Sequence, residues 1–154
     1  MINHGMFTSE KETWGTPHAV FDALNKEFNF TIDLCADSYN YKMKPYYTEI
    51  QNSLSLSWDN ERGYCNPPYG REIKHWVKKA YESKGLIVML IPSRTDTEYW
   101  HDYVMKAKEI RFIRGRLKFE NDDRVGTQPA PFPSAIVVFD GQAHDIPIIK
   151  SVKY

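Results

Sequence analysis

Apolar residues recur at helical spacing in two stretches of the chain. In the first, side chains three and four residues apart predict a helix over residues 17–28, with Thr16-Pro17 as its N-cap and first helical position. In the second, the same spacing predicts an amphipathic helix over residues 71–84, which Gly85 ends. The apolar positions are Val20, Phe21, Leu24 and Phe28 in the first helix, and Ile73, Trp76, Val77, Ala80 and Tyr81 in the second.

Two further stretches have the pattern of buried strands. Residues 30–35 predict a short buried strand, in which Asp33 is the one charged residue. Residues 86–91 are continuously apolar, which is typical of a parallel strand buried on both faces. A capping box from Thr95 to Glu98 follows this run and predicts a helix that continues to about residue 108.

The last third of the chain predicts an antiparallel hairpin. Residues 110–119 alternate between basic and apolar side chains, which predicts a strand with Arg114, Arg116 and Lys118 on one face. The β-branched run at 134–139 predicts its partner, and the tail after residue 140 adds an edge segment.

The polar and aromatic stretch at 37–62 limits the size of the sheet. Each further strand–helix–strand unit needs about 30 residues, so the first half of the fold must be shortened, with Tyr46-Tyr47-Thr48 as a short strand. The order of elements predicts an α/β domain with a mostly parallel sheet that an antiparallel hairpin closes. At 154 residues the chain predicts one domain, residues 1–154, with residues 1–13 loosely held.

Composition narrows the function classes. Twenty basic and twenty acidic residues give no net charge, which argues against a protein that binds nucleic acid tightly through its overall charge. The two cysteines, Cys35 and Cys65, form no metal-ligand cluster, and we expect no metal and no disulfide. With no signal peptide and no apolar run long enough for a bilayer, we expect a cytoplasmic protein with no membrane partner.

The candidate chemistry centres on Asn66-Pro67-Pro68-Tyr69. A residue before proline is extended, so Asn66 is expected to project its amide from a strand end. The two prolines fix the backbone and remove two N–H groups, which leaves the Asn66 side-chain oxygen and the Pro67 carbonyl as rigid acceptors. With Tyr69 beside them, the set suits a planar group that bears an NH₂, although a proline-rich turn has the same sequence.

Asp33 is the second unusual position, because a carboxylate in a buried strand is costly unless it is paired. Either the ammonium group of a ligand pairs it, or it caps a local turn. A nucleoside pocket also needs flat walls and hydroxyl partners, for which Tyr47, Trp58 and Asn52 are candidates. Each of these three residues could instead pin a long loop to the core.

Several segments, in order along the chain, make it similar to the small phage and prophage DNA N6-adenine methyltransferases, which use S-adenosylmethionine (SAM). Asn-Pro-Pro-Tyr is the catalytic motif of the wider amino-methyltransferase family. The similar segments lie at residues 14–17, 30–36, 45–48, 65–69, 91–97, 100–103, 114–119 and 130–135.

The resemblance implies a truncated Rossmann-like methyltransferase sheet and methyl transfer from SAM to adenine N6 in DNA. It implies that Asn66, Pro67, Pro68 and Tyr69 are catalytic, and that the target adenine is flipped out of the helix. It also makes the Trp-x-Thr-Pro segment a cofactor contact. The expected cofactor residues are therefore Trp14, Thr16, Pro17, Asp33, Asn40, Tyr47 and Trp58. One departure is that Ala36-Asp37-Ser38-Tyr39-Asn40 replaces the usual glycine-rich turn.

For DNA, the expected contacts are Arg94, Arg114, Arg116, Lys118 and Phe132. The three basic residues on one strand face would bind phosphates, or would only protect a sheet edge. The loop at 120–133 is expected to be mobile and to close over the flipped base, with Phe132 as a wedge or as a core anchor. No segment is left for a separate target-recognition domain, which predicts a short or degenerate target site.

Two alternatives remain at this point. The same motif would suit another planar NH₂, such as cytosine N4 or a protein glutamine. The missing glycine-rich turn and the neutral charge also fit a non-enzymatic nucleic-acid-binding protein on a methyltransferase scaffold.

Overall fold

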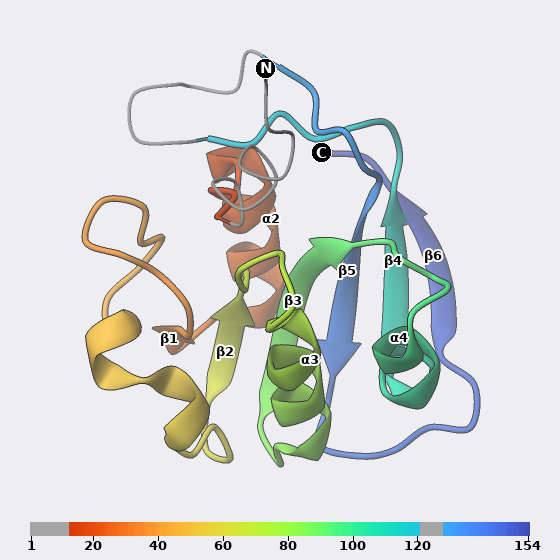
Figure 1. Cartoon of the computed structure of the whole chain (residues 1–154), viewed down its shortest axis with the longest axis horizontal. Coiled ribbons are helices and arrows are strands. Elements are labelled where there is room, and N and C mark those ends of the chain that lie inside the picture. Colours follow the sequence, from red (N-terminus) through yellow and green to blue (C-terminus); the bar gives the residue numbers. More distant parts are fainter. Residues whose placement is uncertain (1–12, 121–127) are drawn as a thin grey trace, which may run out of the picture.

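A computed structural model of the chain describes residues 13–120 and 128–154. It contains a six-stranded sheet in the order β1-β2-β3-β5-β4-β6, flanked by helices (Figure 1). The strands are β1 (Ile32–Asp33), β2 (Arg62–Cys65), β3 (Leu86–Pro92), β4 (Glu109–Ile113), β5 (Ser134–Phe139) and β6 (Ile148–Val152). The helices are α2 (His18–Phe28), α3 (Ile73–Glu82) and α4 (Glu98–Asp102), with short 3₁₀ turns η1 (Glu49–Gln51), η2 (Ser53–Ser55) and η3 (Val104–Lys106).

The sheet is mixed, as the sequence predicts. β1, β2 and β3 are parallel neighbours, whereas β5 lies between β3 and β4 and is antiparallel to both. β6 pairs in parallel with β4, so the tail does add an edge strand. Because β1, β2 and β3 run in the same direction, the residues that follow them gather at the carboxyl ends of these strands, where open α/β sheets bind their ligands.

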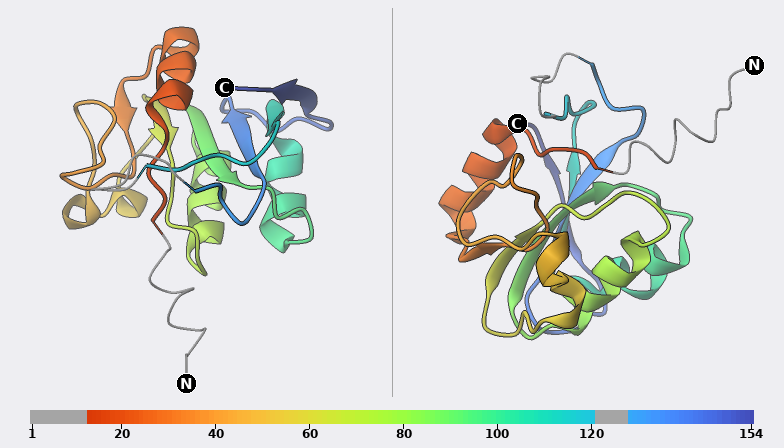
Figure 2. Two further views of the ribbon diagram at one scale, coloured as in Figure 1. Left: turned by 90° about the horizontal axis from the view of Figure 1, so that it is seen from above. Right: turned by 60° about the vertical axis from the view of Figure 1, so that its left-hand side comes forward.

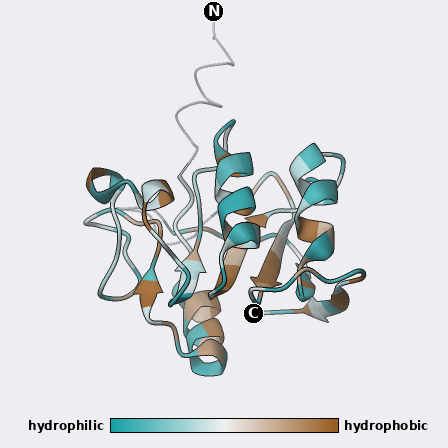
Figure 3. Ribbon diagram, turned by 90° about the horizontal axis from the view of Figure 1, so that it is seen from below, coloured by the Kyte–Doolittle hydropathy of each residue, from teal (hydrophilic) through white to brown (hydrophobic). Residues whose placement is uncertain are grey.

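Helices cover both faces of this sheet. α2 lies on one face, and α3 and α4 lie on the other (Figure 2). The strands β3 and β5 form the centre of the core: Ile87 to Ile91 and Ala135 to Val137 are completely inaccessible to solvent. Hydrophobic residues accordingly concentrate on the strands, while the outward faces of the helices are hydrophilic (Figure 3).

An ion-pair network connects α2 to strand β4. Arg111 of β4 is buried, and its guanidinium donates to both carboxylate oxygens of Glu27, at 2.7 and 2.5 Å. It also donates to Glu109 at 2.7 Å. The hydrogen bond from Arg111 lowers the pKa of Glu27, as expected for a two-point contact between guanidinium and carboxylate.

Helix boundaries differ from the sequence prediction. Thr16 does not cap α2: Pro17 occupies the N-cap position, and the Thr16 hydroxyl bonds elsewhere in the fold. α3 ends at Glu82 with Ser83 extended, and Gly85 is not a left-handed cap. Glycine is needed there because a Cβ would lie 2.3 Å from the Trp58 carbonyl oxygen. The predicted capping box at Thr95 is also wrong, since Thr97 caps α4.

The strand predictions fail mainly by length. β1 has only two residues, and the expected strand at 46–48 is a single bridge between Tyr46 and Asp33. β4 ends at Ile113 rather than continuing to residue 119, because Gly115 has a positive φ of 77° that breaks the strand. Beyond it, residues 116–119 lie outside any named strand.

Candidate active site

The proline motif follows β2 directly, so it lies at the carboxyl ends of the parallel strands. β2 lies between β1 and β3, parallel to both, and Asn66 is the first residue after its end at Cys65. Pro67 is buried and Pro68 is half-buried, so the backbone turns away from the sheet without exposing the motif fully. The prediction that Asn66 leaves a strand end is therefore confirmed.

The Asn66 side chain is held from three directions. Its Nδ2 donates to the backbone carbonyl oxygen of Trp14 and to the hydroxyl of Thr16 at 3.1 Å. Its Oδ1 accepts from the phenol of Tyr69 at 2.6 Å. Since a carbonyl oxygen can only accept, the contact with Trp14 fixes which end of the amide is NH₂. The amide oxygen therefore remains the acceptor, as the expected chemistry requires.

Tyr69 is more enclosed than the sequence predicts. Its ring packs edge-on against Phe119 and Phe132, at centroid distances of 6.0 and 5.6 Å, and its phenol oxygen also lies 3.0 Å from the Leu90 carbonyl oxygen. Burial raises the pKa of Tyr69 well above its ordinary value, so the phenol stays protonated. Stacking of this ring on a substrate remains a proposal, because it requires these aromatic neighbours to make room.

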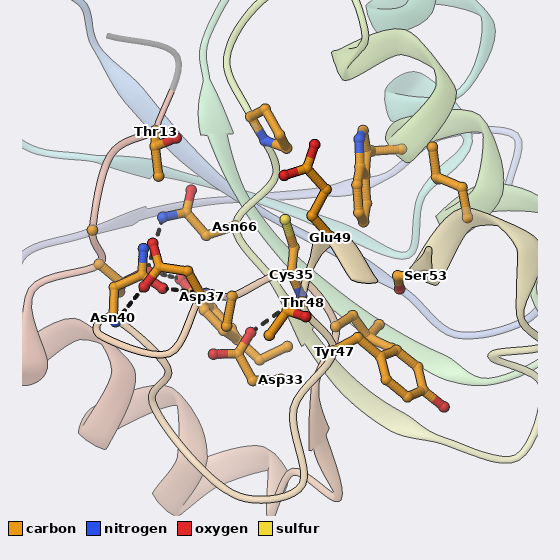
Figure 4. Close-up of a pocket in the computed structure, with 18 of the residues that line it drawn as sticks. Thr13, Asp33, Cys35, Asp37, Asn40, Tyr47, Thr48, Glu49, Ser53 and Asn66 are labelled. Atoms are coloured by element: carbon orange, nitrogen blue, oxygen red, sulfur yellow. Dashed lines mark hydrogen bonds between the residues drawn. The ribbon is translucent and has the colours of Figure 1, made fainter. Parts of the chain in front are cut away.

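A cavity of about 760 Å³ opens beside Asn66 at the carboxyl ends of β1 and β2 (Figure 4). Most of the predicted cofactor residues line it. These are Trp14, Thr16, Asp33, Asn40, Tyr47 and Asn52, together with Asn66 and Pro68 of the motif. Its volume is in the range of small-molecule sites in proteins.

Two predicted cofactor residues are not part of the lining. Pro17 lies just before α2, where its carbonyl accepts from Val20 and Phe21. Trp58 is 1% exposed and donates from Nε1 to the backbone and hydroxyl oxygens of Ser53. Trp58 therefore supports the wall from behind, which corrects the prediction that it faces the ligand.

Asp33 is both a turn cap and part of the cavity lining, so the two interpretations of this residue are not exclusive. Its side chain is 2% exposed, and its oxygens accept from the backbone N–H groups of Lys42 at 3.0 Å and Cys35 at 3.3 Å. Burial raises the pKa of Asp33 to about 7, against which these two hydrogen bonds act only in part. A cation in the cavity would favour the ionised form.

Comparison with known proteins decides the family. Residues 5–153 match the model of the family described as DNA N-6-adenine-methyltransferase (Dam). The chain belongs to this family. It is also 31% identical, over 142 residues, to the DNA N-6-adenine-methyltransferase of Haemophilus phage HP1, an alignment that covers 88% of this chain and 82% of the relative.

The family membership resolves what the motif leaves open. The protein is an adenine-N6-specific DNA methyltransferase rather than a non-enzymatic scaffold or an enzyme for another planar amine. Among residues 13–120 and 128–154, no helix is long and apolar enough to cross a membrane.

This methyltransferase builds the turn after β1 from side chains instead of glycines. Asp37 Oδ1 accepts from the backbone N–H groups of Tyr39 and Asn40, each at 2.8 Å. Asn40 returns the contact, because its Oδ1 accepts from the N–H of Asp37 at 2.8 Å. The predicted cofactor residue Asn40 therefore also holds the loop in shape, and Ala36 ties it to Tyr47 through a backbone bond of 2.9 Å.

Sequence reasoning missed several residues of the methyltransferase cavity. The missed lining residues include Asp37, Glu49, Ser53, Glu72 and Trp76. With Asp33, the carboxylates make the cavity acidic. A capping box between Thr48 and Gln51 marks the turn that carries Glu49, and it could have been found from the sequence. Helical spacing places Trp76 on the core face of its helix, but this residue is only partly buried and also lines the cavity.

The expected DNA contacts divide into two groups. Arg94, Arg114, Arg116 and Lys118 are all exposed, and Arg116 donates to the Ala130 carbonyl oxygen at 3.2 Å. Phe132 is half-buried, with its ring 5.1 Å from Trp14, so it does act as an anchor. The expectation of a mobile loop concerns residues 121–127 in part, which lie outside the described residues.

Trp14 connects the segment that carries the basic residues to the Asn66–Tyr69 motif. Glu120 N–H donates to the Gly15 carbonyl oxygen at 2.8 Å, and the ring of Phe119 lies 5.5 Å from that of Trp14. Trp14 in turn provides the carbonyl that holds Asn66. The candidate DNA face and the candidate active site are therefore neighbours in the fold.

Proposed function

We propose that this DNA N6-adenine methyltransferase binds SAM in the acidic cavity and holds a flipped adenine at Asn66 and Pro67. In this proposal the sheet is a truncated Rossmann-like methyltransferase sheet, and the whole chain is one minimal catalytic domain. The observation that carries it is the position of Asn66, whose amide is fixed beside the cavity at the end of β2.

The volume of the cavity and the charge of its lining support SAM as the ligand. SAM supplies a methyl group on a sulfonium, which is an electrophile that needs no further activation. Its positive charge suits a lining that contains Asp33, Asp37, Glu49 and Glu72. Asp33 is the candidate partner for the ammonium group, because burial leaves its carboxylate in need of a cation. Glu49 and Asn52 are candidates for the ribose hydroxyls, and Trp76 and Tyr47 for the flat walls around the adenine ring.

Asn66 and Pro67 would align and activate the adenine amine. The Asn66 Oδ1 has a second lone pair besides the one that Tyr69 uses, and it would accept one N6 hydrogen. The Pro67 carbonyl would accept the other hydrogen. As N6 bonds to the methyl group it becomes cationic, so both contacts strengthen toward the transition state. The amine then loses a proton to solvent, and no covalent enzyme intermediate is needed.

DNA would bind across the exposed basic residues Arg94, Arg114, Arg116 and Lys118 next to this site. Phosphate contacts position DNA but carry no sequence information, so these residues would set affinity and orientation. The balanced net charge fits weak binding away from the target, and the proposed place of action is the cytoplasm, where the DNA substrate is present.

The test is methyl transfer by Asn66→Ala. We expect the rate of labelled methyl transfer from SAM to adenine-containing DNA to fall by about 100-fold or more. Asn60→Ala, at an exposed position in the turn before β2, is the matched control and should keep the wild-type rate. SAM binding by calorimetry and the melting temperature check that the cavity and the fold survive. Full activity in Asn66→Ala would reduce the motif to a turn and overturn the proposal.

A further inference from the structure

Two buried hydroxyls lie next to the Asn66 amide, and the residues that carry them, Tyr64 and Thr16, also contribute to the wall of the cavity. The hydroxyls of Tyr64 and Thr16 are 2.5 Å apart, and Thr16 Oγ1 accepts from Asn66 Nδ2 at 3.1 Å. Tyr64 is 1% exposed and Thr16 is 2% exposed. The three side chains form a continuous hydrogen-bonded path from the β2 core to the catalytic motif.

This path constrains the direction of the Asn66 amide. Both hydrogens of Nδ2 are used, one by the Trp14 carbonyl and one by Thr16. If the amide turned over, Oδ1 would face the Trp14 carbonyl oxygen, and two acceptors would be in contact. The bond to Thr16 adds a second point of attachment, so the amide is fixed in rotation as well as in orientation.

The Tyr64 hydroxyl is not required for packing. The Tyr64 ring lies edge-on to Phe21 at 5.2 Å and tilted against Phe30 at 5.5 Å, contacts that a phenylalanine would keep. Burial raises the pKa of Tyr64 well above its ordinary value, so the hydroxyl stays neutral. Whichever of the two hydroxyls donates, Oγ1 of Thr16 keeps a lone pair that can accept from Nδ2.

We propose that Tyr64 and Thr16 are positioning residues that lock Asn66 in the direction needed to accept the adenine amine. This inference rests on the proposed catalytic role of Asn66. It gives Tyr64 a role in the reaction, and it gives Thr16 a role besides contact with the cofactor. Because a displacement of about 1 Å in a positioned group can cost about 100-fold in rate, removal of an anchor should appear in kcat.

Three variants separate this role from packing and from cofactor binding. Tyr64→Phe removes only the hydroxyl, Thr16→Val removes the acceptor at nearly constant volume, and Thr16→Ser keeps the hydroxyl. Tyr81→Phe is the matched control, because Tyr81 packs against Tyr103 and Phe139 and does not line the cavity. The measurements are kcat and KM for SAM with a DNA substrate, SAM affinity by calorimetry, and melting temperature.

We expect kcat to fall about tenfold in Tyr64→Phe, with SAM affinity within about twofold of wild type. The fall in kcat should be larger in Thr16→Val. Thr16→Ser should recover much of the rate that Thr16→Val loses. The double variant Tyr64→Phe/Thr16→Val should be no slower than Thr16→Val, since Tyr64 acts through Thr16. Tyr81→Phe should keep the wild-type kcat whatever its effect on stability.

Other outcomes would overturn the proposal. A wild-type kcat in Tyr64→Phe would show that its hydroxyl is only structural, and weakened SAM binding with unchanged kcat in Thr16→Val would leave that residue a cofactor contact. Independent, additive losses in the double variant would exclude a path through Thr16. Asn66→Ala measured alongside separates the two levels of argument: if it is inactive while Tyr64→Phe is normal, the positioning role fails and the proposed function stands.

Discussion

The phenol oxygen of Tyr69 lies 2.6 Å from Oδ1 of Asn66, within the same motif, and it also lies 3.0 Å from the Leu90 carbonyl oxygen on β3. One phenolic proton serves both acceptors. This geometry joins the Asn66 amide to the central strand of the sheet. It gives the hydroxyl of Tyr69 a structural task that is separate from any contact of its ring with a base.

Substitutions at Tyr69 should separate these two tasks. Tyr69→Phe keeps the ring and loses a shared hydrogen bond, so we expect a stability loss of about 1 kcal/mol and a modest fall in rate. Tyr69→Leu fills most of the space without an aromatic face, and we expect kcat/KM for DNA to fall by the equivalent of about 1–3 kcal/mol of stacking. Steady-state kinetics and thermal melting measure both. Equal kcat/KM in the two variants would exclude stacking by this ring.

Asp33 should make the stability of the free protein depend on pH. Burial raises its pKa from 3.8 to about 7, so between these values the folded state holds the proton that the unfolded state releases. Stability from this group is therefore full at low pH and is lost as the pH rises to about 7. Asp33→Asn resembles the protonated form, so it should melt higher than wild type at about pH 8 and equally at about pH 4. The exposed Asp22→Asn is the control.

The same residue should link SAM binding to proton release. If the ionised Asp33 pairs with the ammonium group of SAM, wild-type affinity should rise as the pH rises through about 7, the pKa of Asp33 in the free protein. Asp33→Asn should bind SAM weakly, with little dependence on pH over the same range. Calorimetry from about pH 5.5 to 7.5 gives both curves. Parallel curves for the two proteins would remove Asp33 from the cofactor site.

Periodicity predicted burial better than it predicted hydrogen bonding. Residues 114–119 alternate as a strand would, and the structure does expose Arg114, Arg116 and Lys118 while it buries Leu117 and Phe119. The strand nevertheless ends at Ile113, because Gly115 has a positive φ, and beyond it Phe119 packs edge-on against Trp14. By contrast, β3 and β5 follow the predicted runs closely, since continuous burial on both faces leaves little choice.

The position of a site residue could be predicted from the sequence where the local backbone determines it. Hydrogen bonds between side chains that are distant in the sequence could not be predicted. The proline pair fixes how Asn66 leaves its strand, so the sequence alone places it. Thr16, in contrast, precedes a proline at a helix start and has the local pattern of an N-cap. Its hydrogen-bond partners in the structure are Tyr64 and Asn66, which are 48 and 50 residues away. A pattern of neighbouring residues cannot predict contacts over such a separation. Glu49 lies in a single 3₁₀ turn that has no hydrophobic period, and only the capping box between Thr48 and Gln51 marks this turn in the sequence.

The basic residues beside the site should bind DNA phosphates. Replacing Arg114 or Lys118 with glutamine should lower the slope of log affinity against log salt concentration by about one unit for each phosphate that is no longer neutralised. Lys84→Gln is the matched control. This exposed lysine lies at the amino-terminal end of β3, whereas the candidate site lies at the carboxyl ends of the strands. Fluorescence anisotropy with duplex DNA at several salt concentrations gives the slopes. Identical slopes for all variants would leave these residues as protection for the chain segment after β4.

Phe132 offers a test of how the target base is displaced. Its ring is half-buried between Trp14 and Tyr69, at 5.1 and 5.6 Å, so part of it can still reach DNA. Phe132→Leu keeps an apolar anchor but removes the flat ring. We expect a nearly unchanged melting temperature, and a clear loss of the fluorescence rise that 2-aminopurine shows when it leaves the stack at the target position.

Phe119→Leu, at a more buried position of the same aromatic cluster, is the control for repacking and should lower the melting temperature more than Phe132→Leu does. If Phe132→Leu gives the wild-type fluorescence signal at equal DNA occupancy, Phe132 is an anchor alone and base displacement depends on other residues.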